Sequence, residues 1–278
     1  MTSDYLKKID PDKGIFKGFK EIFSYKDLLY FMSKREVSVL YKQTVLGFLW
    51  AIIRPLFSMI IFSLIFGNLA KIPSDGIPYP LFSYCALVPW TYFSTSLNKS
   101  TQSLITSSSI FTKVYFPRLI LPLAPIFSSL IDFFIALFIV FFMMFYYDIT
   151  FSLSLLWVPL LVFKMMITAA GIGMWLSAMA LQYRDIRHAV VFFVQLLMYL
   201  APVVWPISLF KERFGEFAFL LYGIYPMAGV IEGFRSSLLG INSMPWLLIL
   251  TGLISSLFIF VTGLYYFQKK EKYFADVA

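Results

Sequence analysis

The sequence predicts an all-α membrane protein with six transmembrane helices. Of its 278 residues, 60% are hydrophobic and only 14% are charged, whereas a soluble domain usually has about a quarter charged residues and under half apolar ones. Six apolar stretches divide the chain, and a helix of about 20 residues is long enough to cross a hydrocarbon core of about 30 Å. The stretches are continuous and do not alternate in hydrophobicity as barrel strands do, so we expect helices.

The first 46 residues form a separate charged segment, with nine Lys or Arg and six Asp or Glu. Between residues 15 and 32, apolar residues recur at helical spacing with charged residues between them. This pattern predicts an amphipathic helix that lies on the membrane surface. A helix packed on a soluble partner is the alternative.

The six predicted spans cover most of residues 47–268, which we expect to form one transmembrane domain. They comprise residues 47–69, 79–97, 121–147, 153–181, 189–205 and 246–268. The fifth is short and ends at Pro206. Between the fifth and sixth spans, residues 217–231 are apolar but short and are broken by Pro226. We expect a re-entrant pair of periplasmic helices there, which is tolerated where protein or water satisfies the broken backbone.

The distribution of basic residues predicts the orientation. With six spans, the side that carries both termini holds 17 Lys or Arg, including those of the tail 269–278, and the opposite side holds four. Basic residues concentrate on the cytoplasmic side of membrane proteins, so both termini are expected in the cytoplasm. The net charge of +8 follows from this topology, and we expect no nucleic-acid partner.

Several kinds of chemistry lack their sequence motifs. There is no G-x-x-x-x-G-K-[ST] loop for nucleotide phosphates and no G-x-S-x-G nucleophile motif. His188 is the only histidine and there is no H-E-x-x-H motif, so we expect no metal site. We therefore expect that the chain is not an enzyme and holds no cofactor.

Six segments have a more distinctive sequence than a generic apolar span. They are YKQTVLGFLWAIIRP (41–55), AKIPSDGIPYP (70–80), TKVYFPRLILPLAP (112–125), YRDIRH (183–188), YLAPVVWP (199–206) and YPMAGVIEGFR (225–235). Together, and in this order, they resemble the permease subunits of type-2 ABC exporters, in the branch that exports polysaccharides. The resemblance is greatest to O-antigen (Wzm-like) export permeases, and teichoic acid export permeases are similar. It runs from about Lys20 to Gln268, nearly the whole chain.

The resemblance implies a homodimer of six-span subunits in the bacterial inner (cytoplasmic) membrane. It implies two copies of a cytoplasmic ABC ATPase, which would bind ATP and Mg, and the export of a lipid-linked glycan. A type-2 ABC permease for teichoic acid, a drug or a lipid is the alternative. A secondary transporter or channel is a further one, but it would usually need inverted repeats or several ionisable groups at mid-membrane.

The same resemblance assigns the inner turns to the ATPase. The loop at residues 98–118 is long enough for a short helix and resembles the coupling helix of the family, while a solvated loop is the alternative. Arg184 and Asp185 match an Arg-Asp pair at the next inner turn, where Asp185 could cap the fifth span. The candidate coupling residues are Leu104, Ile105, Ile110, Phe111, Arg118, Arg184 and Asp185.

Three charged residues, Arg54, Asp132 and Lys164, lie within predicted spans. A charge at the centre of a span costs at least ~2.5 kcal/mol on insertion scales, so Arg54 must face a polar interior or extend to the interface. Asp132 and Lys164 lie on adjacent spans and could pair, although their depths differ by about two turns.

Aromatic residues near the span ends suit a glycan, because sugar rings stack on aromatic faces and their hydroxyls accept hydrogen bonds from tyrosine. The candidates for a substrate path are Trp90, Tyr92, Tyr199, Trp205, Tyr222 and Tyr225. The alternative is an interfacial belt that faces lipid. Glu232 and Arg235 are three residues apart on one helical face and could pair. By resemblance they belong to an outer gate, and a surface pair without a role is the alternative.

Overall fold

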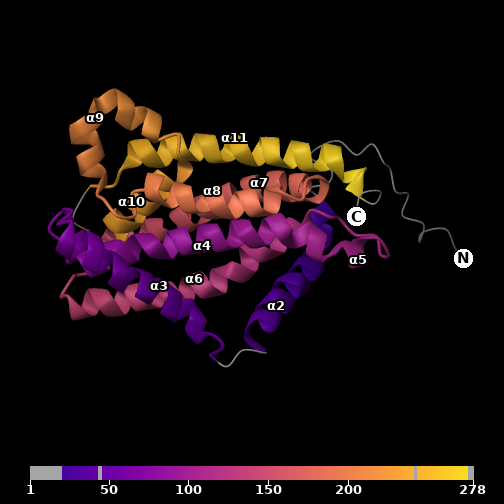
Figure 1. Cartoon of the computed structure of the whole chain (residues 1–278), viewed down its shortest axis with the longest axis horizontal. Helices are drawn as coiled ribbons and strands as arrows, with labels where there is room; N and C mark the ends of the chain where they lie inside the picture. Colours follow the sequence, from indigo (N-terminus) through magenta and orange to yellow (C-terminus); the bar gives the residue numbers. More distant parts are fainter. Residues whose placement is uncertain (1–20, 43–45, 241–242, 275–278) are drawn as a thin grey trace, which may run out of the picture.

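The computed structural model of the chain describes residues 21–42, 46–240 and 243–274, and these are helical with irregular connections and no strand (Figure 1). This confirms the predicted all-α class. In chain order the elements are α2 (Lys26–Lys42), α3 (Leu49–Phe62), the π-helix η1 (Ser63–Leu69), α4 (Tyr79–Thr106), α5 (Ser108–Phe111), α6 (Ile120–Tyr146), the 3-10 helix η2 (Leu153–Trp157), α7 (Val158–Gln182), α8 (Ile186–Leu200), α9 (Ile207–Tyr222), α10 (Pro226–Leu239) and α11 (Trp246–Glu271).

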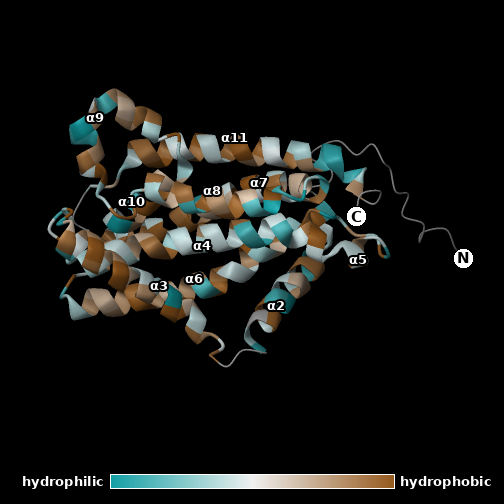
Figure 2. Ribbon diagram, in the orientation of Figure 1, coloured by the Kyte–Doolittle hydropathy of each residue, from teal (hydrophilic) through white to brown (hydrophobic). Residues whose placement is uncertain are grey.

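The long helices α4, α6, α7 and α11 run side by side as one bundle (Figure 1). The short helix α5 and the last turn of α11 lie at one end, and α9 lies at the other; we call these the α5 end and the α9 end. Hydrophobic residues predominate between the two ends, while hydrophilic residues occur on α9 and at the close of α11, and also on α2 and along the central helix α4 (Figure 2). This banding is expected of a bundle whose sides face hydrocarbon.

A helix lies in each of the six predicted spans, although the fifth, 189–205, is helical only as far as Leu200. The helices are not equally suited to cross a membrane by themselves. Among the residues that the structure describes, four segments are long and apolar enough: Leu49–Leu69, Ile120–Tyr146, Leu153–Gln182 and Trp246–Glu271. The bent pair of α9 and α10 would add a fifth. The helix α8 has only 15 residues, and α4 is long but more polar, so the count of six spans stays a prediction.

The polarity of α4 is explained by its central place. Eighteen of its 28 residues are buried, and it packs against α3, α6, α7, α8 and α10. Its hydroxyls bond to carbonyls of its own turns, as Thr101 does to Leu97 at 2.8 Å. Ser100 instead reaches the carbonyl of Pro122 on α6 at 2.8 Å. A helix enclosed by protein needs less hydrophobicity than one that faces lipid.

The α7–α11 contact depends on small residues. A Cβ atom added to Gly171 would lie 2.7 Å from the Cα of Phe260, and one added to Gly263 would lie 2.3 Å from the carbonyl oxygen of Gly171. Glycine at these positions lets the two backbones approach closely, as is common between membrane helices.

The N-terminal helix lies further along the chain than predicted. The prediction was residues 15–32, whereas α2 runs from Lys26 to Lys42 after a separate helical turn at 21–24; residues 15–20 lie outside the described part. Helix α2 packs on α6, and Ser33 is buried. Phe31 and Val39 of α2 stay exposed beside its charged residues. The helix continues because nothing between Met32 and Lys42 breaks it, since neither proline nor glycine occurs there.

Two further boundaries differ from the prediction. Residues 98–106 are the last two turns of α4 and not a loop. The interrupted segment extends over α9 and α10, residues 207–239, instead of 217–231, and the two helices are bent by 114°. Pro226 begins α10 instead of breaking it, because proline is tolerated in the first helical turn. All 14 residues of α10 are buried.

Candidate functional site

The chain leaves helical structure between α8 and α9, at residues 201–206, which we call the buried bend. Ala201 and Val203 are fully buried there. Irregular backbone in the interior must find hydrogen-bond partners, because an unpaired carbonyl away from water is costly. Side chains from α4, α9 and α10 and the residue just before α10 supply these partners.

Arg235 on α10 is the centre of this arrangement. Its Nη2 donates to the carbonyl of Val203 at 2.8 Å and its Nη1 to that of Trp205 at 3.4 Å. The guanidinium lies 3.6 Å from the ring centre of Phe82 and its Nε donates to the carbonyl of the same residue at 3.4 Å. Nη1 also pairs with Oε2 of Glu232 at 3.2 Å. Both charged side chains are only 4% exposed, so the alternative of a surface pair is wrong.

Three tyrosines complete the set of donors. Tyr222 donates to the carbonyl of Leu200 at 2.7 Å and Tyr225 to that of Leu197 at 3.2 Å. Both carbonyls lie in the last turn of α8, and that of Leu197 also accepts the backbone N–H of Ala201 at 2.9 Å. Tyr79 donates to the carbonyl of Val204 at 2.7 Å. The bend is therefore held on several sides by specific hydrogen bonds.

The structure does not bring the six candidate substrate-path aromatics together. Trp205 and Tyr222 lie 5.8 Å apart, and Tyr225 lies 6.3 Å from Tyr222, so these three form one cluster at the buried bend. Tyr199 is 60% exposed on α8. The other two, Trp90 and Tyr92, are buried on α4, and the hydroxyl of Tyr92 donates to the carbonyl of Ile126 on α6 at 3.0 Å.

A second polar feature, which we call the polar cavity, has a volume of about 230 Å³ between α3, α4 and α6. The charged residues that line it are Arg54, Lys99 and Asp132. The carboxylate of Asp132 accepts a hydrogen bond from the hydroxyl of Tyr41 on α2. The guanidinium of Arg54 lies 5.5 Å from the ring centre of Trp50. Arg54 therefore lines a polar cavity, as one of its two predicted environments requires, but the residue is exposed and not enclosed by the bundle.

Lys164 lies elsewhere, so the proposed Asp132–Lys164 pair does not form. Its side chain on α7 is 1% exposed and its Nζ donates to the carbonyl of Leu248 on α11 at 3.5 Å. Gly229 and Gly252 leave room for this ammonium group, since a Cβ on either would lie within 3 Å of it. The cations that line the same cavity as Asp132 are instead Arg54 and Lys99. The sequence analysis predicts a loop at Lys99.

The signal for Lys99 was available but ambiguous. It lies in the run STSLNKSTQS (94–103), where many hydroxyl residues favour a loop. In the structure, Ser94, Thr101 and Ser103 bond to carbonyls within α4, which makes the run compatible with a buried helix.

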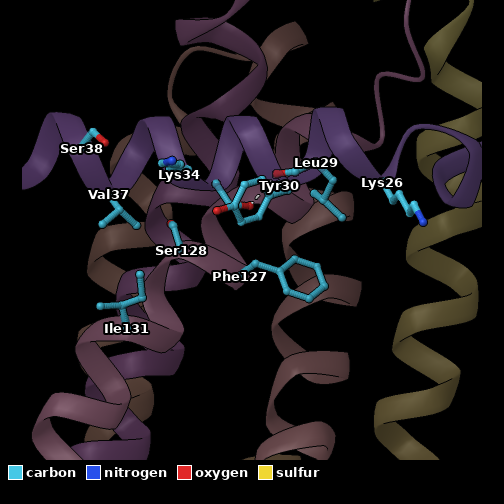
Figure 3. Close-up of a pocket in the computed structure, with 10 residues that line it drawn as sticks. Lys26, Leu29, Tyr30, Lys34, Val37, Ser38, Phe127, Ser128 and Ile131 are labelled. Carbon is cyan, nitrogen blue, oxygen red and sulfur yellow. Dashed lines mark hydrogen bonds between the residues drawn. The ribbon is translucent and has the colours of Figure 1, made fainter.

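A groove of about 540 Å³ lies between α2 and α6, next to the polar cavity. Figure 3 shows α2 lying across the helices behind it, with Phe127 and Ile131 of α6 below. The lining is Lys26, Leu29, Tyr30, Ser33, Lys34, Val37, Ser38, Phe127, Ser128 and Ile131. Ser128 donates to Glu36 on α2 at 2.8 Å. Burial raises the pKa of the Glu36 carboxyl, and this outweighs the lowering by the Ser128 hydrogen bond and by Lys99 and Arg35.

At the α5 end, Arg118 joins the turn after α5 to the close of α11. Its Nη1 donates to the carbonyl of Glu271 at 2.6 Å, and its guanidinium lies 5.3 Å from the ring centre of Phe111. Among the candidate coupling residues, Leu104 and Phe111 are buried in the chain's own core. Ile105 and Ile110 are half-buried.

The exposed apolar residues of this turn are ones that the sequence analysis did not select. Val114 is 60% exposed and Tyr115 is 51% exposed. Arg184 and Asp185 are exposed at the neighbouring turn before α8. Asp185 holds the position before the first residue of α8, but its side chain makes no capping hydrogen bond, so the predicted cap is wrong.

Comparison with known proteins gives two concordant results. The sequence profile of the family described as "ABC-2 type transporter" matches residues 27–239. Two curated proteins of Klebsiella pneumoniae, both named "O-antigen export system permease protein RfbA", are each 29% identical to this chain over 90% of its length and 95% of theirs. A protein of the same name from Myxococcus xanthus is 25% identical over 78% of this chain and 82% of its own.

Proposed function

Because this chain belongs to the ABC-2 type transporter family, we propose that it is the permease subunit of an ABC exporter for a lipid-linked polysaccharide. The observation that carries the proposal is the similarity to O-antigen export permeases along nearly the whole chain. The substrate is then a glycan attached to a lipid, and the chain is inert without a separate ATPase, in accordance with its lack of a phosphate-binding loop.

The expected assembly is a homodimer in the bacterial inner membrane with two ATPase subunits on the cytoplasmic side. The α5 end would face the cytoplasm, where the turn around Val114 and Tyr115 offers exposed apolar contacts to the ATPase. Arg118 would couple movement of this turn to α11, because its guanidinium bonds to the carbonyl of Glu271 at the end of that helix. Both termini would lie on this side.

Substrate would approach from the cytoplasmic leaflet through the groove between α2 and α6. Its wall combines apolar side chains with the basic residues Lys26 and Lys34, which suits a lipid with an anionic head. ATP-driven closure of the partner subunits would then separate α3 and α8 of the two copies to open a path. The α9–α10 pair would open outward, which requires the hydrogen bonds of the buried bend to give way.

Co-purification with an ABC ATPase tests the partner. We expect a stable complex whose ATPase activity exceeds that of the ATPase alone, and an active chain that needs no ATPase would contradict the proposal. Deletion of the gene tests the substrate. We expect loss of surface polysaccharide with unchanged drug sensitivity; the reverse pattern would favour a type-2 permease for a drug, and loss of teichoic acid would favour that polymer.

A further inference from the structure

The groups that line the polar cavity are left without partners to an unusual extent. Among the described residues, neither Arg54 nor Lys99 forms an ion pair. The hydroxyl of Ser129, which also lines the cavity, has no hydrogen-bond partner in the described part of the chain, although the residue is only 1% exposed. Buried polar groups are nearly always satisfied, so an orphaned hydroxyl beside two cations indicates a missing partner.

The charge in and around the cavity favours an anion as that partner. The charged groups that act on Lys99 are Arg54, Asp132 and Glu36. The two carboxylates already have hydrogen bonds: Asp132 accepts from Tyr41, and Glu36 accepts from Ser128 on the groove side of α6. Within residues 21–42, 46–240 and 243–274 the two cations have no such bond, and cationic side chains within a membrane span are costly unless they serve a ligand or a pair.

The size of the cavity limits what the anion can be. The cavity has a volume of about 230 Å³. This accommodates a phosphate or a diphosphate but not an oligosaccharide, and it is below the usual 300 Å³ or more of a pocket for a drug-sized ligand. A neutral sugar hydroxyl would not balance the lining either, which has two cations and one carboxylate.

The surroundings of the cavity suit a lipid. The cavity is lined on one side by α3, in which Pro55 is the only buried residue, so the rest of a bound molecule can remain in hydrocarbon. Ser129 and Asp132 line the cavity, while Ser128 and Ile131 on the neighbouring face of α6 line the groove. A lipid that approaches through the groove therefore meets the cavity one residue away along the same helix.

We propose that the polar cavity binds the phosphate or diphosphate of the lipid that carries the glycan, with Arg54 and Lys99 as its charge partners. The hydroxyl of Ser129 donates a further hydrogen bond. The inference rests on the proposed function and adds the chemical group by which the chain recognises its substrate. Phosphate of an ordinary membrane phospholipid has the same chemistry, so the test separates the two sources.

The test measures equilibrium binding to the purified full chain in detergent, with native mass spectrometry as the readout. The probes are farnesyl diphosphate, farnesol and dioleoylphosphatidylglycerol. We expect farnesyl diphosphate to bind, and both farnesol and the phospholipid to bind at least about tenfold more weakly. Arg54→Ala and Lys99→Ala should each weaken farnesyl diphosphate binding by about tenfold or more, the usual effect of losing one charge-assisted hydrogen bond.

Two controls keep the result interpretable. Arg213→Ala removes an exposed cation on α9, at the opposite end of the molecule, and should leave binding unchanged. Arg54→Lys keeps the charge and should restore most of the affinity, and the unfolding temperature of each variant shows whether it is folded.

Equal binding of farnesol, or unchanged binding by both alanine variants, would overturn the site. Equal and equally variant-sensitive binding of the phospholipid would overturn the assignment to the lipid carrier. Failure of this inference leaves ATPase stimulation and surface polysaccharide unaffected as tests of the proposed function. Conversely, diphosphate binding without either of those would reject the function and not the site.

Discussion

The buried bend and the polar cavity both gather charged side chains between helices of the bundle, but they differ in how those side chains are satisfied. At the bend, Arg235 meets Glu232 and three backbone carbonyls, and both charges are almost fully buried. In the cavity, and within the described residues, Arg54 and Lys99 have no ion pair and the hydroxyl of Ser129 has no hydrogen-bond partner. The first is a closed network and the second is an open one.

This difference separates a structural role from a binding role. A closed network contributes to the folded state and must be broken for the helices around it to move. An open set of donors contributes little to folding, but it is ready to receive a ligand with the opposite charge. The comparison therefore predicts that mutations at the bend change stability, whereas mutations in the cavity change recognition.

The largest expected effect is that of Arg235→Ala. Removing one partner of a buried ion pair leaves Glu232 unpaired and should cost about 3–5 kcal/mol in the free energy of unfolding. The measurement is denaturation of the purified protein in detergent. The matched control is Lys211→Ala, whose partner Glu216 lies at 3.2 Å in an exposed pair and which should cost under about 1 kcal/mol. Similar losses in the two variants would remove the basis for calling the bend a closed network.

A smaller contrast comes from removing single hydroxyls. Tyr222→Phe removes the donor of the partly buried hydrogen bond to the carbonyl of Leu200 and should cost about 0.5–1.5 kcal/mol. Ser129→Ala removes a hydroxyl that has no partner and should change the free energy of unfolding by less than about 0.5 kcal/mol. The same denaturation assay compares them, and a larger loss for Ser129→Ala would mean that the cavity is also closed.

Asp132→Asn tests whether the charge of the polar cavity controls the affinity for an anionic ligand. The substitution removes the one negative charge in the lining while leaving an acceptor for Tyr41. Repulsion between two like charges a few ångströms apart is worth about 1 kcal/mol in a well-solvated site, so farnesyl diphosphate should bind several-fold more tightly. Weaker binding in this variant would show that the carboxylate itself holds the ligand or its counter-ion.

The smallest expected effect is a pH dependence of the α2–α6 contact. Burial raises the pKa of Glu36 above its ordinary value of 4.5, so the folded chain holds the proton more tightly than the unfolded chain does. The resulting stabilisation of the contact is fully present below the ordinary value and is lost as the pH rises through the raised one.

Spin-label mobility on α2 can follow this change, because it does not depend on pH by itself. A label at Val39→Cys is selective, since the only native cysteine, Cys85, is buried. Mobility should increase as the pH rises in the otherwise native chain and should stay low at every pH with Glu36→Gln. An identical pH response in the two would assign the change to another group.

The fold was predictable from the sequence because its main determinant is local. Apolar runs of helical length can be read directly from the sequence, and they predict helices at the positions of α6, α7 and α11. The boundaries that failed depend on tertiary surroundings. Residues 98–106 look like a loop by composition, and they are helical because α4 is enclosed by neighbouring helices that spare it from lipid.

The site was predictable only in part for the same reason. Spacing on one helix was enough to find the Glu232–Arg235 pair, because the two residues are one turn apart. It could not find Lys99 beside Asp132, which requires knowing how α4 and α6 face each other. Nor could it show that Trp90 and Tyr92 are buried, because position along a span does not reveal which face of the helix meets lipid.

ATP-dependent translocation in reconstituted vesicles tests the account most directly. Vesicles that contain this chain and its ATPase are loaded with a lipid-linked glycan in the leaflet on the ATPase side, and a glycosidase is confined to the opposite side. We predict that the glycan becomes susceptible to the glycosidase only when ATP is present, and more slowly with Arg54→Ala. Glycan that stays protected with ATP, or becomes susceptible without it, would contradict the assignment of this chain as the export permease.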